Sequence, residues 1–140
     1  QGVMSMAIDL FVGLWELDPS QSNYQVGDAP KRGTYRISKH EGGYLITMAW
    51  TDAQGRNREM AYEGTPDGIQ YPLENSIIAD GMSMTRVDEY TLDSATYKGR
   101  DQIAHARREL SEDGNVMTVT QSGKTPDGKD FANIAVYNRR

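Results

Sequence analysis

Apolar and polar residues alternate along most of this chain, and short clusters of turn-forming residues interrupt the alternation. A period of two places every second side chain on one face of a β-strand, so the pattern predicts half-buried strands. No stretch keeps the 3.6-residue period of a long amphipathic helix. The strands are predicted at about residues 10–17, 32–39, 43–51, 56–63, 68–74, 81–88, 90–98, 101–110, 115–122 and 130–139.

The segments between these runs are short and rich in Gly, Asp and Pro. Pro presets the first position of a turn, Asp accepts hydrogen bonds from its own backbone, and Gly tolerates positive φ. Connectors this short join antiparallel neighbours. The chain is therefore predicted to be all-β, a single antiparallel up-and-down β-barrel of eight to ten strands with little or no helical lid.

One connector, residues 18–31, is longer and polar, and it contains Pro19, Gly27 and Pro30 without an amphipathic period. Loops of this length in compact domains are often functional, and a disordered crossover is the alternative. We expect this loop to leave the barrel mouth open or to cover it without helices. Residues 10–140 then form one barrel domain, preceded by an extension at residues 1–9.

Strand alternation also predicts which side chains face the barrel interior. The predicted inward set is rich in Met and Tyr, with a few Arg: Tyr44, Ile46, Met48, Trp50, Arg58, Met60, Tyr62, Ile69, Tyr71, Leu73, Met82, Met84 and Arg86. Met adapts to irregular space, and Tyr combines an apolar ring with a polar tip. Such a lining suits an amphipathic guest, and an ordinary packed core with Arg at its rim is the alternative.

Composition and charge exclude several classes of protein. The net charge of −5 and a pI near 5.0 argue against nucleic-acid binding, which needs clustered basic residues. The absence of Cys excludes disulfides and thiolate chemistry. No apolar run approaches the ~20 residues of a membrane span. Gln1-Gly2 has the form of a cleaved-tag remnant, with Met4 or Met6 as the native start. The lack of a signal-peptide pattern favours a cytoplasmic location, although a removed signal peptide would leave the same chain.

Both ends of the chain resemble the intracellular lipid-binding proteins of the calycin superfamily, which include fatty-acid-binding and retinoid-binding proteins. The resemblance depends on a Phe-x-Gly-x-Trp-x-Leu start at residues 11–17, a hairpin at 108–118 and a closing strand at 136–139. Asn23-Tyr24 is a displaced candidate for the family's Asn-aromatic pair. Asp18-Pro19-Ser20 is closer to bacterial lipocalin-like domains that share a Gly-x-Trp-x-Leu-Asp-Pro-Ser start. The resemblance implies a ligand-binding barrel.

The resemblance also implies anchors for a ligand carboxylate. Arg108 matches the family's interior Arg, and Tyr137 matches the Tyr of its final Arg-x-Tyr motif, but Ala135 occupies the Arg position of that motif. One of two anchoring cations is therefore missing, and Arg86 or Arg58 is a candidate substitute. Bidentate Arg–carboxylate pairs are about twice as strong as neutral hydrogen bonds, so this loss bears directly on ligand affinity.

The facing of strand 101–110 is open from the sequence alone. The resemblance turns Ala104, Ala106 and Arg108 inward, whereas hydrophobic alternation also allows Ile103, His105 and Arg107 to face inward, and a one-residue slip reverses every side chain. His105 is a weak candidate for acid–base catalysis only in the second case.

The sequence hypothesis is non-covalent binding of a small hydrophobic or amphipathic ligand, including an anionic one, inside the barrel. The predicted ligand-binding residues are Arg108, Tyr137, Arg86, Arg58, Trp50, Met48, Met60, Tyr62, Tyr71, Met82 and Met84. A cofactor-independent isomerase or decarboxylase using His105 is one alternative. Another is a filled barrel that meets a protein partner through Val12, Leu14, Ile134 and Val136. We expect no metal or cofactor, no nucleic-acid partner, and a monomer or weak homodimer.

Overall fold

The computed structural model describes residues 8–73 and 79–140, and the statements below concern those residues. They form eleven strands and one short 3-10 helix: β1 (Gly13–Leu17), η2 (Pro19–Gln21), β2 (Asn23–Tyr24), β3 (Arg32–His40), β4 (Gly43–Thr51), β5 (Asn57–Gly64), β6 (Tyr71–Pro72), β7 (Gly81–Asp88), β8 (Thr91–Lys98), β9 (Asp101–Leu110), β10 (Val116–Lys124) and β11 (Asp130–Arg139).

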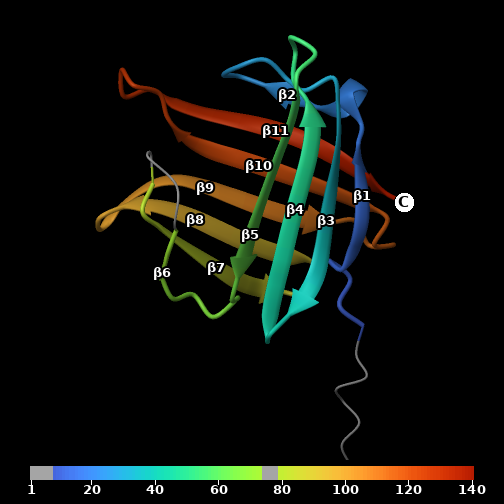
Figure 1. The fold of residues 1–140 in the computed structure, drawn as a ribbon, viewed down its shortest axis with the longest axis vertical. Coiled ribbons are helices and arrows are strands. Elements are labelled where there is room, and N and C mark those ends of the chain that lie inside the picture. Colours follow the sequence, from blue (N-terminus) through green and yellow to red (C-terminus); the bar gives the residue numbers. More distant parts are fainter. Residues whose placement is uncertain (1–7, 74–78) are drawn as a thin grey trace, which may run out of the picture.

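All these strands belong to one antiparallel sheet in the order β5-β4-β3-β1-β11-β10-β9-β8-β7-β6, with β2 added to β11. The first and last strands meet, because Trp15 lies opposite Arg139 and Leu17 opposite Tyr137. The sheet curls so that β3, β4 and β5 cross in front of β7–β11 (Figure 1). The predicted all-β barrel is confirmed. The one additional strand, β2, contains only two residues.

The sheet does not close through a continuous ladder, because its two ends are β5 and β6. We call the junction between β5 and β7 the seam. The backbone N–H of Gly68 donates to the carbonyl of Met84 across it, at 2.8 Å. The Met84 side chain also lies directly against Gly64. Residues 57–61 of β5 are exposed throughout. The seam is therefore held at one end of β5 and open at the other.

One end of the interior is filled by large apolar side chains, and we call it the closed end. Its fully buried members are Phe11, Trp15, Ile37, Tyr44, Ile46, Met84, Leu92 and Met117. They come from six strands and from the segment before β1. Burying a large apolar side chain contributes roughly 1.5–3 kcal/mol, so this cluster supplies much of the driving force for folding.

The segment before β1 runs along the closed end and is held there by two charged residues. Arg139 donates to the backbone oxygens of Leu10, Val12 and Gly114, the last two at 3.0 and 2.9 Å. Its guanidinium carbon lies 4.2 Å from the centre of the Trp15 ring, within cation–π distance. Arg139 therefore joins β11 to the chain entering β1.

Asp9 is the second of these charged residues. It forms ion pairs with Lys39 at 3.0 Å and Arg86 at 3.2 Å, and it accepts a hydrogen bond from the Tyr44 hydroxyl. Burial acts to raise the pKa of Asp9, but the donors Tyr44, Lys39 and the Phe11 N–H outweigh it and hold the pKa at about 2. Because Tyr44 lies on β4 and Arg86 on β7, Asp9 connects the two sides of the seam.

Alternation predicted most strands closely, and 43–51, 81–88, 101–110 and 130–139 have the predicted bounds. The predicted strand at 68–74 is wrong over most of its described length, where β6 covers only Tyr71–Pro72; residue 74 lies outside the described residues. The Asp67 carboxylate accepts from the Ile69 N–H and the Tyr71 hydroxyl. These local bonds compete with a regular ladder.

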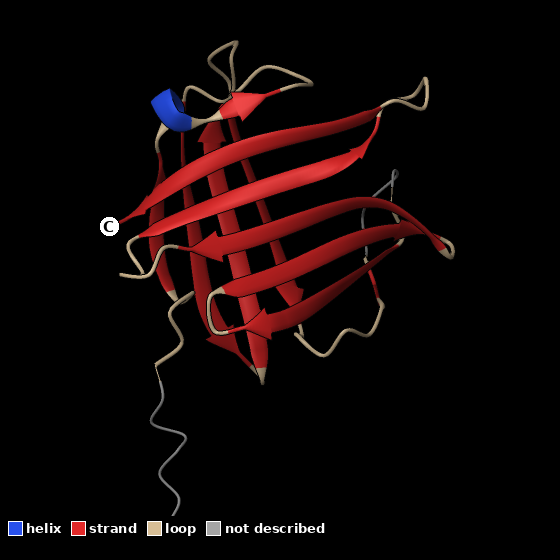
Figure 2. Cartoon of the chain, turned by 180° about the vertical axis from the view of Figure 1, so that it is seen from behind, coloured by secondary structure: helices blue, strands red, loops and turns tan. Residues whose placement is uncertain are grey.

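The connector at 18–31 is more structured than predicted. Asp18 accepts from the backbone N–H of Ser20 at 3.1 Å and caps η2, which begins at Pro19. After β2, the Asn133 side chain accepts from the N–H groups of Gln25 and Val26. Figure 2 shows η2 beside β2 at one end of the barrel. Side-chain hydrogen bonds of this kind leave no periodic signal in a sequence.

Candidate functional site

Arg108 on β9 is the most deeply buried charged side chain of the described interior, with 2% of its surface exposed. Its Nε donates to the Tyr35 hydroxyl at 2.6 Å, its Nη1 to Ser94 Oγ at 3.1 Å and its Nη2 to the Tyr62 hydroxyl at 2.5 Å. We call these four residues the Arg108 cluster. They come from β3, β5, β8 and β9, so the cluster spans the barrel.

Arg108 therefore faces the interior, which is the facing of strand 101–110 that the family resemblance favoured. In register, Arg108 lies opposite Leu92 on β8 and Val119 on β10. The other candidate set, Ile103, His105 and Arg107, lies on the outer face.

No carboxylate among the described residues forms an ion pair with Arg108; its partners are three neutral hydroxyls. Burial acts to lower the pKa of Arg108, but the neighbouring Tyr35 and Tyr62 oxygens outweigh it, so the pKa lies above its usual value. Burial raises the pKa of Tyr62 well above its usual value, despite the opposing charge of Arg108. The cluster therefore holds a buried positive charge with neutral phenols around it, and a buried charge without an anion is costly.

The interior beyond the Arg108 cluster, away from the closed end, is the mouth half. Tyr35 lies opposite Met48, and Met48 opposite Met60. Directly opposed residues share one face of an antiparallel sheet, so both methionines face inward like Tyr35. Met60 is nevertheless 52% exposed. Met60 lies on the edge strand β5, whose residues 57–61 are all exposed, so solvent reaches the inner face of this half along the open part of the seam.

Trp50 and Arg58 lie opposite each other at the rim of the mouth half. Arg58 is exposed, and its Nε lies 3.3 Å from the Asp52 carboxylate. It therefore ends at the rim and does not contact the Arg108 cluster. Tyr137 lies nearer to the cluster, with its ring packed edge-on to Tyr35 at 5.3 Å between centroids. Burial raises the pKa of Tyr137 above its usual value.

Other predicted lining residues differ in their surroundings. Met84 belongs to the closed end, and Met82 is buried, with 9% of its surface exposed. Tyr71, on β6, lies opposite Met82 on β7. Its hydroxyl donates to Asp67, and the residue is exposed. Of the predicted apolar set, Met48, Trp50 and Met60 define the accessible wall.

The prediction that Arg86 could replace the missing family cation does not fit its contacts. Its Nη1 bonds Asp9 and the Tyr44 hydroxyl, and its Nε donates to the Asp88 carbonyl at 2.7 Å. The guanidinium also lies 5.1 Å from the centre of the Phe11 ring. Arg86 is held at the closed end by its contacts with Asp9, Tyr44 and Phe11.

His105 does not face the interior. Its Nε2 lies 3.5 Å from the Asp93 carboxylate on the outer face, and Arg107 forms two 2.8 Å bonds with the same carboxylate. His105 therefore has no access to the barrel interior, and the predicted catalytic candidate is not part of this site. No group of three or more potential metal ligands gathers among the described residues.

Sequence reasoning missed two members of the Arg108 cluster. Tyr35 and Ile37 are two residues apart on β3 and are both buried. Alternation along this strand could therefore have predicted that Tyr35 faces inward. Ser94 is a small polar residue in an ordinary strand, and nothing in the sequence distinguishes it.

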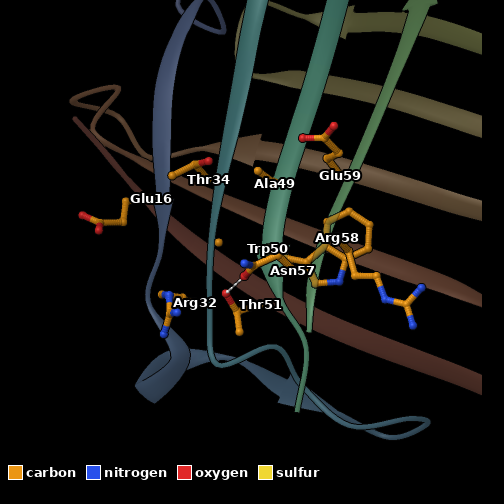
Figure 3. A pocket seen from close by; sticks show the side chains of 10 residues that line it. Glu16, Arg32, Thr34, Ala49, Trp50, Thr51, Asn57, Arg58 and Glu59 are labelled. Carbon is orange, nitrogen blue, oxygen red and sulfur yellow. Dashed lines mark hydrogen bonds between the residues drawn. The ribbon is translucent and has the colours of Figure 1, made fainter. Parts of the chain in front are cut away.

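Two hollows lie along the sheet away from the Arg108 cluster. The larger, about 520 Å³, crosses β1, β3, β4 and β5 (Figure 3). Glu16, Thr34, Ala49 and Glu59 form one cross-strand row through it, on the face opposite to Tyr35. The smaller, about 370 Å³, lies over β9–β11 and includes His105 and Phe131. Both have mixed polar linings, and neither contains Arg108.

Comparison with known proteins supports the fold. The zebrafish ileal bile acid-binding protein, in a crystal structure complexed with cholic acid, matches with a TM-score of 0.54 at 10% identity, covering 94% of this chain and 99% of that one. The siderocalin Ex-FABP matches with a TM-score of 0.41 at 14% identity, covering 94% of this chain and 74% of that one. No family model and no curated protein matches the sequence. The match to the bile acid-binding protein confirms the antiparallel β-barrel fold predicted from the sequence. Among the described residues, no helix has the length and apolar character to cross a bilayer.

Proposed function

We propose that this calycin-like barrel binds a small hydrophobic or amphipathic molecule in its mouth half. The proposal rests on one observation: side chains on the same inward-facing surface differ in how much of them solvent reaches. Trp15 at the closed end is fully buried, whereas Met60 is 52% exposed although it faces inward. An inward face that solvent reaches is available to a guest.

The chemistry of the accessible wall supports an apolar or amphipathic guest. Met48, Trp50 and Met60 offer polarisable and aromatic surface that adapts to different shapes. Arg108 adds a positive charge below this wall, which favours an acceptor or acidic group at the inner end of the guest. The matched bile acid-binding protein was crystallised with cholic acid, so a barrel of this fold accommodates an amphipathic acid.

The packing of the closed end limits the length of the guest. On β3 only three residue steps separate Tyr35 from the first residue of the strand, Arg32, roughly 10 Å at about 3.3 Å per residue. Because the zigzag of an extended chain advances about 1.3 Å per C–C bond, a chain of about eight to nine carbons has this length. Longer chains then extend beyond the mouth.

A series of straight-chain carboxylates tests the proposal by isothermal titration calorimetry. Each CH₂ that becomes buried contributes about 0.8 kcal/mol, so affinity is expected to rise up to about octanoate and then to level off towards hexadecanoate. Ala106 lies on the inner face opposite Ser94 and Gln121, and Ala106→Phe is expected to weaken binding at least tenfold.

Ala61→Phe is the matched control, because Ala61 is exposed and faces outward opposite Thr47. Its affinity for octanoate is expected to equal that of the natural sequence. Absence of binding both of this series and of a neutral ketone of similar length, or equal binding by the Ala106→Phe variant, would contradict the proposed function.

A further inference from the structure

Tyr62 is the most accessible member of the Arg108 cluster. Arg108, Tyr35 and Ser94 are all buried, at 2%, 3% and 7% exposure, whereas Tyr62 is only half-buried. All three guanidinium nitrogens already donate to hydroxyls. A guest entering the mouth half therefore meets a phenol before it meets the guanidinium.

The phenols of the cluster keep a proton to donate. A phenol oxygen that accepts from Arg108 retains its own O–H. Both phenol oxygens accept from Arg108, and a hydrogen bond from one phenol to the other would use only one of their two protons. One O–H remains for an acceptor on the guest, and the adjacent positive charge strengthens it as a donor.

A carboxylate gains little more than a neutral acceptor at this place. Val119 lies opposite Arg108 on β10, and Ala135 lies opposite Val119 on β11, so this row contributes no second cation. Three of the five N–H groups of Arg108 donate to the cluster hydroxyls, and only 2% of the residue is exposed. A carboxylate that reaches the guanidinium must therefore enter the buried cluster and lose its own hydration, which is far more costly for a charge than for a carbonyl.

We infer that the Tyr62 hydroxyl is the donor that recognises the guest's polar group, and that the site selects neutral amphipathic molecules bearing a carbonyl. In this arrangement Arg108 is a positioning residue, which orients and polarises Tyr62 without touching the guest. The inference rests on the proposed function and names the ligand class for the same site.

Calorimetry with 2-octanone and octanoate tests the inference. The natural sequence is expected to bind 2-octanone at least as tightly as octanoate. Tyr62→Phe is expected to weaken binding of 2-octanone about five- to tenfold, the worth of one hydrogen bond to a polarised donor. Tyr97→Phe is the matched control, because its hydroxyl bonds Ser83 on the outer face, and its affinity is expected to be unchanged.

The inference requires both that 2-octanone binds at least as tightly as octanoate and that Tyr62→Phe weakens its binding. Failure of either result overturns the inference. Binding of octanoate alone would overturn the ligand class and leave the proposed function standing, whereas binding of neither probe to the natural sequence would overturn both. A measurement without a variant covers the case in which Tyr62→Phe fails to fold. The carbonyl stretch of bound ¹³C-labelled 2-octanone is expected at a lower frequency than that of the same ketone dissolved in an alkane. A band at the same frequency would show that no hydrogen-bond donor reaches the carbonyl.

Discussion

Replacing Arg139 by Met is expected to destabilise the barrel strongly. The side chain donates to three backbone oxygens, on Leu10, Val12 and Gly114. Hydrogen bonds from charged donors contribute about 1.5–3 kcal/mol each, and the stacking on Trp15 adds about 0.5–2 kcal/mol. Water replaces part of what is lost at these oxygens. We therefore expect a loss of about 3–5 kcal/mol, a large share of the 5–15 kcal/mol typical of whole domains.

Urea unfolding followed by Trp fluorescence measures this loss, because Trp15 is one of two Trp residues and lies against the guanidinium. Arg139→Lys is the informative control, since it keeps the charge but cannot form the planar fork of three bonds. Its loss is expected to be about half of that of the Met variant. A loss below about 1 kcal/mol for Arg139→Met, or none for Arg139→Lys together with a full loss for Met, would refute the reasoning that the fork holds the closed end.

Two further predictions concern the seam and the closed end. A Cβ at Gly43 would collide with the backbone oxygen of Gly64, whereas a Cβ at Gly64 would meet the flexible ends of the Met84 and Met82 side chains. Gly43→Ala is therefore expected to destabilise the protein by about 1–3 kcal/mol in thermal unfolding, and Gly64→Ala by less. Equal losses of stability would contradict this geometry. The pKa of Asp9 lies at about 2 in the folded protein against an ordinary 3.8, so its ionised form stabilises the fold above pH 4, and this stabilisation is lost as the pH falls through 2. The difference in stability between the natural sequence and Asp9→Asn is expected to shrink over that range, and a difference independent of pH would show that the ion pairs contribute nothing.

Strand alternation predicted the fold because it depends on each residue's immediate neighbours. The runs at 43–51 and 101–110 could be located without knowing their partners in the sheet. It failed at 68–74, where the Asp67 side chain supplies a local alternative to the ladder. Such a turn depends on individual hydrogen bonds, and it leaves the alternation of apolar and polar residues in the sequence unchanged.

The Arg108 cluster could be predicted only in part. The inward facing of Arg108 came from a family resemblance, since alternation alone allowed the opposite facing. Tyr35 lies 73 residues away and Tyr62 46 residues away along the chain, so their convergence depends on how the sheet curls. The contact of Arg86 with Asp9 could not be predicted for the same reason, because Asp9 lies 77 residues away along the chain. Pairings at this distance are set by the closed barrel as a whole.

The pairing of β1 with β11 also determines when the molecule can fold. A ribosome releases β1 early, but its neighbour in the sheet is made last, and the bond from Arg139 to Val12 spans 127 residues. Contacts between distant residues slow folding, because the intervening chain must be ordered first. During synthesis the β3–β4–β5 meander can assemble from local hairpins, whereas β1 has only one of its two neighbours. The closed end can therefore be completed only after translation has passed Arg139.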